Sequence, residues 1–376
     1  MKSNNSVTDY RAIFLEGEPL MDVRAPVEFN RGAFPSSVNI PLLDNDQREI
    51  IGIEYKNAGE QAAILLGQKM ATPEIRQQRL VDWVAHCRAN PSGYLYCFRG
   101  GLRSRITQSW IAESGVNYPI IGGGYKAMRR FLIDELEQCV SKHEFIMVSG
   151  NTGSGKTDLL NQLPLFVDLE GLANHRGSAF GSNVNDLQPS QITFENTLAI
   201  DFLKLDRKST ASPVFLEDEG RRIGRLCLPT SLCAKMRDAP RAILEEPLST
   251  RVELIRRDYI SSAWPLYQHE YGNDAEVRFS EFVLNNLSKI RKRLGDDRYK
   301  RVASIFGYAL KQLFIEGKAD AFDEGIAILL VDYYDPMYQF QLKQKDSNIL
   351  FRGNANEYLV WADEFKNEEG LAGLKR

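Results

Sequence analysis

The sequence predicts an α/β protein of two domains, each built on a parallel sheet. Three observations support this fold class. The first 120 residues alternate short β-branched or aromatic runs with longer helix-like stretches. A phosphate-binding motif then follows the apolar run EFIMVS and precedes another helical pattern. Beyond residue 250 the apolar spacing is mainly helical. We therefore expect a parallel-sheet domain over residues 1–142, followed by a P-loop NTPase-like α/β domain with a helical C-terminal region over 143–376.

The elements of the first domain follow from local patterns. The runs AIFLE, LMDVRA, GYLYC and YPIIGG are expected strands. Between them, AAILLGQKMA and RQQRLVDWVAHCRAN have the apolar spacing of amphipathic helices. A helix over 125–141, with apolar residues every three to four positions, should close the domain. A new strand begins at Glu144, which places the boundary near residue 142.

Composition excludes several classes of protein. A chain of 376 residues is too long for one core, and 43% hydrophobic with 26% charged residues excludes disordered, collagen-like and disulfide-scaffold proteins. Five thinly spread cysteines indicate a reducing compartment. The N-terminus lacks a signal peptide, and the apolar runs are too short to cross a bilayer. We expect a cytoplasmic protein without a membrane partner.

The segment GNTGSGKT fits the P-loop pattern G-x-x-x-x-G-K-S/T. Glycines let backbone N–H groups surround phosphate oxygens, the lysine supplies a charge, and the threonine can hold Mg²⁺. The expected phosphate-binding residues are Gly150, Gly153, Ser154, Gly155, Lys156 and Thr157. Asp168 in LFVDLEG and Asp218 in VFLEDEG are alternative metal-side carboxylates. The N-K-x-D guanine signature is absent from the sequence, which leaves ATP transfer, ATP hydrolysis or another diphosphate open.

A second motif surrounds Cys97, at the end of the expected strand GYLYC. The following loop runs toward a helix N-terminus, where N–H groups, the helix dipole and arginines favour a thiolate and an anion beside it. The expected anion-binding residues are Arg99, Gly100, Gly101, Arg103 and Ser104. The alternative is a small core residue at a strand end. A thiolate in such a loop suits either phosphate-ester chemistry, as in cysteine phosphatases, or the carriage of a persulfide or perselenide.

The stretch DLEGLANHRGSAFG is a candidate ligand loop, because polar residues gather there between glycines after a strand. Its candidates, together with the acidic run after the later strand, are Asp168, His175, Arg176, Ser178 and Asp218. A structural loop with polar caps is the alternative. No His or Cys cluster has metal-site spacing, so we expect no metal centre built by these side chains.

The segment DVRAPVEFNRGAFPSSVNIP, at 22–41, resembles the first signature of rhodanese-type sulfurtransferase domains. The matching residues are Asp22, Arg24, Pro26, Glu28, Phe29, Gly32, Pro35, Asn39 and Pro41. CFRGGLRS resembles the catalytic cysteine loop of those domains, and GGGYKAMRR their closing motif. The first domain is therefore expected to be rhodanese-like. Joined to a P-loop domain with DLEGLANHRGSAFG and EDEGRRIG, it makes nearly the whole chain similar to the bacterial tRNA 2-selenouridine synthase family.

The resemblance implies a substrate, two co-substrates and a partner. The substrate is a tRNA with 2-thiouridine at the wobble position, selenophosphate donates selenium, and geranyl diphosphate alkylates the thio group. The P-loop is then expected to hold a prenyl diphosphate, with Mg²⁺ as a further candidate, and an enzyme that supplies selenophosphate is a candidate partner. Two alternatives stay open: an ATP-dependent enzyme whose first domain senses redox state or binds a partner, and a sulfurtransferase that carries a persulfide on Cys97.

Binding a tRNA requires contacts to phosphates and to splayed anticodon bases. The stretch from 288 to 301 holds seven Lys or Arg against two Asp. Its candidate tRNA contacts are Arg291, Lys292, Arg293, Arg298, Lys300 and Arg301. A solvated helix face is the alternative. Tyr333, Tyr334 and Tyr338 are aromatic residues that serve either base stacking or core packing.

Overall fold

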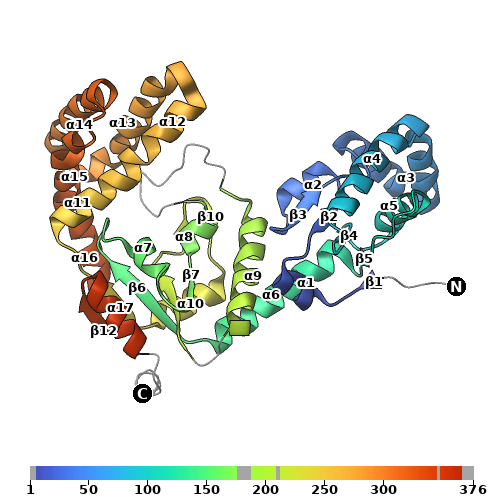
Figure 1. The fold of residues 1–376 in the computed structure, drawn as a ribbon, viewed down its shortest axis with the longest axis horizontal. Coiled ribbons are helices and arrows are strands. Elements are labelled where there is room, and N and C mark those ends of the chain that lie inside the picture. The colour runs from blue at the N-terminus through green and yellow to red at the C-terminus, as the bar shows by residue number, and fades with distance from the viewer. Residues whose placement is uncertain (1–5, 176–187, 209–211, 345–347, 366–376) are drawn as a thin grey trace. The chain divides into compact units, whose positions relative to one another are not determined.

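A computed structural model describes residues 6–175, 188–208, 212–344 and 348–365. It confirms the predicted fold class, because both halves of the chain are α/β with parallel sheets (Figure 1). The chain separates into two compact units. The first comprises Met1–Cys139 with Pro189–Arg207, and the second comprises Val140–Gln188 with Lys208–Arg376.

The first unit holds a five-stranded sheet in the order β1-β5-β4-β2-β3, with all neighbours parallel. Its strands are β1 (Ser6–Val7), β2 (Leu20–Asp22), β3 (Ser37–Asn39), β4 (Tyr94–Tyr96) and β5 (Ile120–Ile121). Leu20 pairs with Ser37 on one side and with Tyr94 on the other. The expected strand GYLYC is therefore the central strand, and Cys97 lies just beyond its carboxyl end.

Helices connect the parallel strands of this unit, as parallel pairing requires. They are α1 (Tyr10–Glu16), α2 (Pro26–Arg31), α3 (Asn45–Met70), α4 (Pro73–Ala89), α5 (Leu102–Glu113) and α6 (Gly124–Lys142). A later helix, α9 (Gln191–Lys208), also packs here: Asn196 donates to the carbonyl of Ala33 at 2.8 Å and accepts from Arg129 at 2.8 Å. The core includes the fully buried Trp83 and Leu95.

The prediction of a strand at AIFLE is wrong, because these residues belong to α1. Asp9 caps the helix by accepting from the N–H of Ala12 at 3.0 Å. Gly17 ends it in a left-handed conformation with φ of 67°. An N-cap aspartate and a glycine just past the last turn are helix signals, and they outweigh the β-propensity of a short apolar run.

The second unit is built on a parallel sheet in the order β12-β11-β6-β8-β7. Its strands are β6 (Phe145–Gly150), β7 (Phe166–Val167), β8 (Val214–Glu217), β11 (Arg241–Leu244) and β12 (Ile349–Gly353). The edge strand β12 comes from the region expected to be mainly helical. A short antiparallel pair, β9 (Arg222–Ile223) and β10 (Leu226–Cys227), stands apart from this sheet. The central strand β6 leads straight into the P-loop and α7 (Lys156–Leu160).

Most of the remaining second unit is helical, and Figure 1 shows α12 to α14 stacked together. Its helices are α8 (Leu169–Leu172), α10 (Thr230–Asp238), α11 (Leu248–Arg256), α12 (Ala263–Tyr271), α13 (Ala275–Leu294), α14 (Asp296–Glu316), α15 (Asp323–Leu329), α16 (Asp335–Gln344) and α17 (Ala355–Glu364). Two π-helical segments, η1 (Arg257–Ser261) and η4 (Leu330–Tyr334), continue α11 and α15. Phe279, Phe306 and Phe322 lie in the core of this helical region. Within the described residues, no helix has the length and apolarity needed to cross a membrane.

Candidate functional site

Cys97 is buried, with 3% of its surface exposed, and packs in the core of the first unit. The backbone around it is tied to the start of α6: the carbonyl of Cys97 accepts from the N–H of Tyr125, and that of Phe98 from the N–H of Lys126, both at 2.9 Å. The loop then reaches Leu102, where α5 begins. Cys97 thus lies between a strand end and a helix N-terminus, as the sequence predicts.

Two glycines allow this loop to pack backbone against backbone. Gly124 has φ of 58°, and a Cβ there would lie 2.3 Å from the carbonyl oxygen of Cys97 and 2.4 Å from the N of Gly100. Gly100 has φ of 62°, and a Cβ there would meet the carbonyl oxygen of Ile121 at 2.7 Å. A side chain at either position would strain the backbone and displace the cysteine loop.

The predicted anion-binding residues differ in their surroundings. Arg103 is half-buried and forms a bidentate pair with Glu28, at 2.6 and 3.2 Å. Burial opposes ionisation of Glu28, but the hydrogen bond and charge of Arg103 outweigh it, so the pKa of Glu28 lies below its ordinary value. Arg99 is exposed. Ser104, in the first turn of α5, is fully buried, and its Oγ makes no hydrogen bond to any residue that the structure describes.

A buried ion pair supports the same region. Arg24, 2% exposed, donates to both carboxylate oxygens of Asp22 and to the carbonyl of Gly32 at 2.8 Å. Its guanidinium carbon lies 3.8 Å from the centre of the Tyr125 ring. Because the N–H of Tyr125 bonds to the carbonyl of Cys97, the pair is connected to the cysteine loop through one residue.

The P-loop residues of the sequence prediction gather at a cleft of about 710 Å³ in the second unit. Gly150, Gly153, Gly155, Lys156 and Thr157 all line it, whereas Ser154 is buried beneath the loop. The Nζ of Lys156 donates to the carbonyls of Gly150, at 3.0 Å, and Asn151, at 3.4 Å. The positive φ of Gly153 and Gly155, 79° and 80°, curls the loop as phosphate binding requires.

The carboxylate beside Thr157 is Glu217, which sequence reasoning missed. Thr157 Oγ1 donates to Glu217 Oε1 at 3.2 Å, and Glu217 Oε2 accepts from the N–H of Glu170 at 3.0 Å. Asp218 instead accepts from Ser149 at 2.6 Å and Arg241 at 3.3 Å. Asp168 caps α8 by accepting from the N–H of Gly171 at 2.6 Å. Side chains alternate along a strand, and this alternation was the signal that separates Glu217 from its neighbour.

The cleft is strongly acidic. Its carboxyl side chains are Asp158, Asp168, Glu170, Asp218, Glu219 and Asp258, while Lys156 is the sole Lys or Arg among the described lining residues. Burial, together with the charges of Glu170 and Asp168, raises the pKa of Glu217 to about 8. Burial and the charge of Glu170 likewise raise the pKa of Glu219 to about 8. A diphosphate that enters this cleft requires compensation by a cation or by bound protons.

Thr157 and Glu217 are the candidate protein ligands for Mg²⁺ beside Lys156: Thr157 lines the cleft, and Glu217 lies behind it with 1% of its surface exposed. Mg²⁺ is usually held by one or two protein oxygens together with waters and substrate phosphates, and Thr157 with Glu217 offers such a pair. Among the described residues, no three His, Cys, Asp or Glu side chains form a metal-binding group. The Thr157–Glu217 pair does not depend on such a group, because the phosphates and waters supply the other ligands.

Of the remaining candidate residues, some line the P-loop cleft and others lie outside the described residues. His175 lines the P-loop cleft, whereas Arg176 and Ser178 lie outside the described residues. Tyr334 is buried and Tyr338 has a raised pKa caused chiefly by burial, and both line the cleft.

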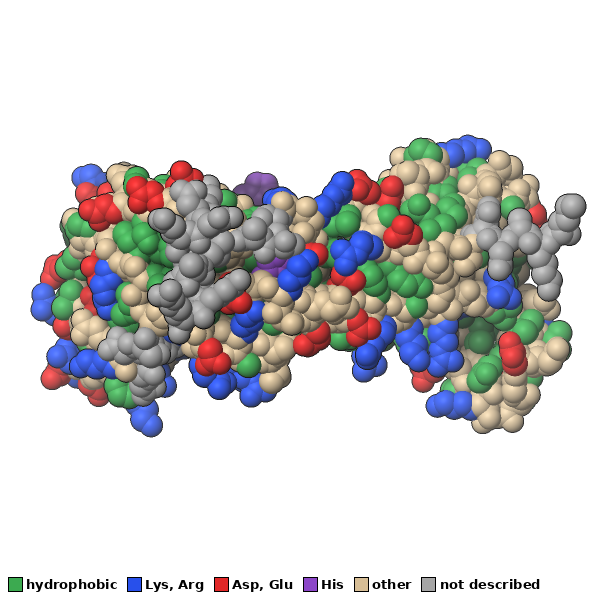
Figure 2. Space-filling view, turned by 90° about the horizontal axis from the view of Figure 1, so that it is seen from below, with side chains coloured by type: hydrophobic (Ala, Val, Ile, Leu, Met, Phe, Trp, Pro, Cys, Tyr) green, Lys and Arg blue, Asp and Glu red, His purple; other side chains and the backbone are tan. Residues whose placement is uncertain are grey.

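All six basic candidates on α13 and α14 are exposed. Three of them form ion pairs: Arg291 with Asp296 at 2.7 Å, Arg298 with Asp332 at 3.0 Å and Arg301 with Glu324 at 2.8 Å. Figure 2 shows that Lys and Arg side chains are interspersed with Asp and Glu on the face it draws. The pairing halves the charge that this run offers to a phosphate backbone, so Lys292, Arg293 and Lys300 become its stronger candidates.

A parallel sheet whose central strand runs into a glycine-rich loop, a lysine and a helix N-terminus defines a P-loop phosphate-binding protein. Comparison with known proteins narrows this class. The profile of the tRNA 2-selenouridine synthase AAA domain matches residues 143–369. The chain is 47% identical to the tRNA 2-selenouridine synthase of Marinobacter nauticus over 96% of this chain and 98% of the relative. It is 44% identical to that of Shewanella oneidensis, over 96% of this chain and 95% of the relative.

The chain belongs to the tRNA 2-selenouridine synthase family. This confirms the predicted resemblance of nearly the whole chain to that family. A solved structure from Clostridium difficile 630, the N-terminal domain of an ATP/GTP binding protein, is 28% identical and covers 34% of this chain and 98% of its own, with a TM-score of 0.30. That score is too low to bear on the fold.

Proposed function

We propose that this protein converts 2-thiouridine at the wobble position of tRNA to 2-selenouridine in two steps, through an S-geranylated intermediate. The observation that carries the proposal is family membership over nearly the full chain, with relatives named tRNA 2-selenouridine synthase. Two motifs of different chemistry support the two steps: a P-loop suited to a diphosphate, and a cysteine at a helix N-terminus suited to a smaller anion.

The first step belongs to the P-loop cleft. The thiocarbonyl sulfur attacks the first carbon of geranyl diphosphate, the carbon–oxygen bond breaks, and diphosphate leaves. Backbone N–H groups of the loop and the ammonium of Lys156 stabilise the charge that develops on the leaving group. Because carboxylates surround this cleft, we propose that the diphosphate binds together with Mg²⁺, held by Thr157 and Glu217. When bound there, Mg²⁺ would supply positive charge to the oxygens of the leaving diphosphate.

The second step uses the first unit. Alkylation turns the sulfur into a good leaving group, so selenium from selenophosphate displaces geranylthiol, while water takes up the phosphoryl group. Cys97 contacts and steers the selenium without forming a bond to it, and the N–H groups at the start of α5, with Arg99, hold the phosphate part. The buried hydroxyl of Ser104 is a further donor for this anion. Arg103 acts by holding Glu28 and the loop.

The substrate of this proposal is a tRNA, and an enzyme that makes selenophosphate is the proposed partner. The exposed basic side chains of α13 and α14 are the proposed phosphate contacts. We place the reaction in the cytoplasm, where a reduced cysteine and tRNA occur together.

The test is mass spectrometry of nucleosides from thiolated tRNA incubated with the protein, selenophosphate and geranyl diphosphate, each omitted in turn. The proposal expects 2-selenouridine in the full reaction and geranylated thiouridine when selenophosphate is withheld. An unchanged tRNA, with ATP or thiosulfate consumed instead, would support an ATP-dependent enzyme or a sulfurtransferase and overturn the proposal.

A further inference from the structure

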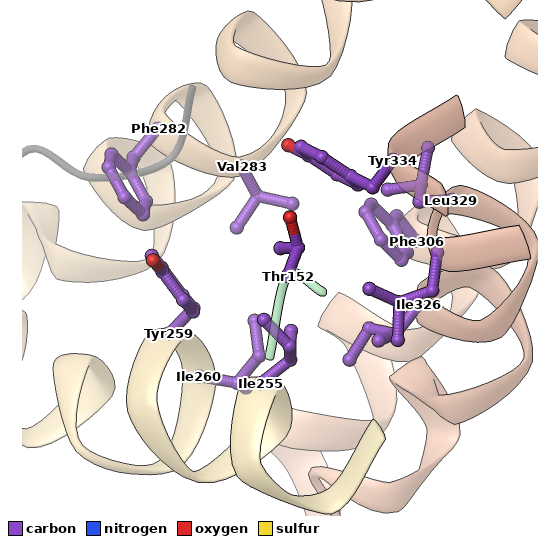
Figure 3. Close-up of a pocket in the computed structure, with 11 residues that line it drawn as sticks. Thr152, Ile255, Tyr259, Ile260, Phe282, Val283, Phe306, Ile326, Leu329 and Tyr334 are labelled. Atoms are coloured by element: carbon purple, nitrogen blue, oxygen red, sulfur yellow. The ribbon is translucent and has the colours of Figure 1, made fainter. Parts of the chain in front are cut away.

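A second pocket, of about 50 Å³, opens beside the P-loop cleft in the helical region of the second unit (Figure 3). The two cavities share four lining residues, Thr152, Ile255, Tyr259 and Tyr334. Thr152 belongs to the P-loop itself, so the pocket begins where the phosphate site ends. A ligand whose phosphate groups are bound at the P-loop can therefore extend directly into the pocket.

The lining of this pocket is almost entirely hydrocarbon. Beyond the four shared residues, it is formed by Ile260, Phe282, Val283, Phe306, Ile326, Leu329 and Leu330. Figure 3 shows these side chains converging around Thr152 from several helices. The lining residues offer hydroxyl groups but no amide, carboxylate or cationic side chain with which to read a nucleobase. An apolar chain matches these walls, and a nucleoside does not.

The pocket is also built from unusual backbone. Tyr259 and Ile260 lie in the π-helical segment η1, and Leu330 and Tyr334 lie in η4. Single π-helical turns are rare and occur frequently at functional sites. The wall is coupled to the P-loop as well: a Cβ on Gly153 would meet Ile255 Cγ1 at 2.8 Å, and Arg251 donates to the carbonyl of Thr152 at 3.0 Å. Both π-helical segments therefore line the same cavity, which adjoins the phosphate site.

We propose that this pocket receives the distal, branched end of the hydrocarbon chain of the diphosphate ester and sets the chain length that the protein accepts. The inference rests on the proposed use of the P-loop for a prenyl diphosphate. A cavity needs about 10–15 Å³ to hold one water molecule. The pocket of about 50 Å³ therefore has room for roughly four groups of that size, which matches one terminal isoprene unit. The carbons nearer the phosphates then lie along Thr152, Tyr259 and Tyr334, which line both cavities.

The test compares the binding of pyrophosphate and of dimethylallyl, geranyl and farnesyl diphosphates to the full-length protein by titration calorimetry with Mg²⁺. We expect geranyl diphosphate to bind at least about tenfold more tightly than dimethylallyl diphosphate, because each buried methylene contributes about fourfold in affinity. Val283→Phe, which fills the pocket, should remove at least about tenfold of geranyl affinity while pyrophosphate affinity stays within about twofold. Phe306→Leu, which enlarges it, should raise farnesyl affinity relative to geranyl affinity.

Leu287→Phe is the matched control, since Leu287 is fully buried on the same helix, α13, but does not line the pocket. It should leave the geranyl preference unchanged. If the folded Val283→Phe and Phe306→Leu proteins keep the original preference among the diphosphate esters, the pocket assignment is wrong, and a prenyl diphosphate is still the ligand of the P-loop. If the original protein binds geranyl diphosphate no better than pyrophosphate, and prefers ATP, both the pocket and the prenyl step of the proposed function fail.

Discussion

The hydroxyl of Thr157 donates a hydrogen bond to Glu217 across 3.2 Å, joining the last residue of the P-loop motif to the last residue of β8. In parallel sheets the carboxyl ends of adjacent strands meet at one edge, and β6 and β8 are paired neighbours here. The pairing places a buried carboxylate against the hydroxyl of Thr157, the proposed Mg²⁺ ligand that lines the cleft.

The first prediction concerns this carboxylate. Glu217→Gln should raise the Mg²⁺ concentration needed for geranylation about 10- to 100-fold, because loss of an oxygen ligand or of its orienting partner weakens metal binding by that amount. The measurement is the initial rate of geranylation against Mg²⁺ concentration. Glu245→Gln is the control, because Glu245 is exposed and pairs with Arg352. A Glu217→Gln protein with the original Mg²⁺ dependence would contradict the assignment.

The second prediction concerns pH. The pKa values of Glu217 and Glu219 are raised from 4.5 to about 8, mainly by burial. Between pH 4.5 and about pH 8 the folded protein binds more protons than the unfolded chain. The stabilisation that comes from this extra proton binding is fully present below pH 4.5 and is lost as pH rises through about 8. The free energy of unfolding should therefore fall between about pH 6 and about pH 8.5, by about 1 kcal/mol or more. Urea unfolding of the ligand-free protein measures it.

Glu217→Gln should flatten this pH dependence, because an amide carries no charge to desolvate. The difference between the two proteins isolates Glu217 from other titrating groups. Equal slopes for the variant and the original protein over this pH range would show that Glu217 does not titrate there.

The third prediction separates the two sites. Cys97→Ala should abolish selenation and leave geranylation, whereas Lys156→Ala should impair geranylation first, because the residues belong to motifs that bind different anions. Nucleoside mass spectrometry measures both products, and circular dichroism checks the fold. Loss of both products in folded Cys97→Ala would refute this division of labour.

Local motifs predicted much of the site. The P-loop between a strand and a helix, and Cys97 at the carboxyl end of a central strand, depend on residues that are close together in the sequence. The assignment of AIFLE failed because the decisive signals, Asp9 and Gly17, lie outside the apolar run. The boundary near residue 142 stays a prediction.

Features that depend on distant segments could not be predicted in this way. The strand β12 joins the sheet beside β11, more than a hundred residues earlier in the chain. The helix α9 packs with residues of the first unit, through the contact of Asn196 with Ala33. The apolar pocket combines the P-loop with four helices and two π-helical turns. In each case tertiary contacts, rather than local periodicity, decide the position.

The fourth prediction concerns the cysteine loop. Gly124→Ala should reduce selenation at least about tenfold, because its Cβ would lie 2.3 Å from the carbonyl of Cys97 at a positive φ. Geranylation should persist. Gly52→Ala is the control, since Gly52 lies in the helix α3, outside the cysteine loop, and a Cβ there meets nothing within 4 Å. Selenation rates, measured with geranylated tRNA as the starting material, distinguish the variants; equal rates would show that the loop tolerates the added methyl group.

The fifth prediction concerns the buried pair beneath that loop. Arg24→Met leaves Asp22 buried without its ion partner, and should destabilise the first unit by about 3–5 kcal/mol. Hydrogen exchange of the β2 and β4 amides reports this unit separately. Arg130→Met is the control, because it breaks an exposed ion pair with Asp134. It should change the free energy of opening measured by hydrogen exchange by no more than about 1 kcal/mol. The double change Asp22→Leu with Arg24→Met should recover much of the loss, because neither charge is then left buried alone. A double variant as unstable as Arg24→Met would show that packing against Tyr125, rather than charge pairing, is what Arg24 contributes.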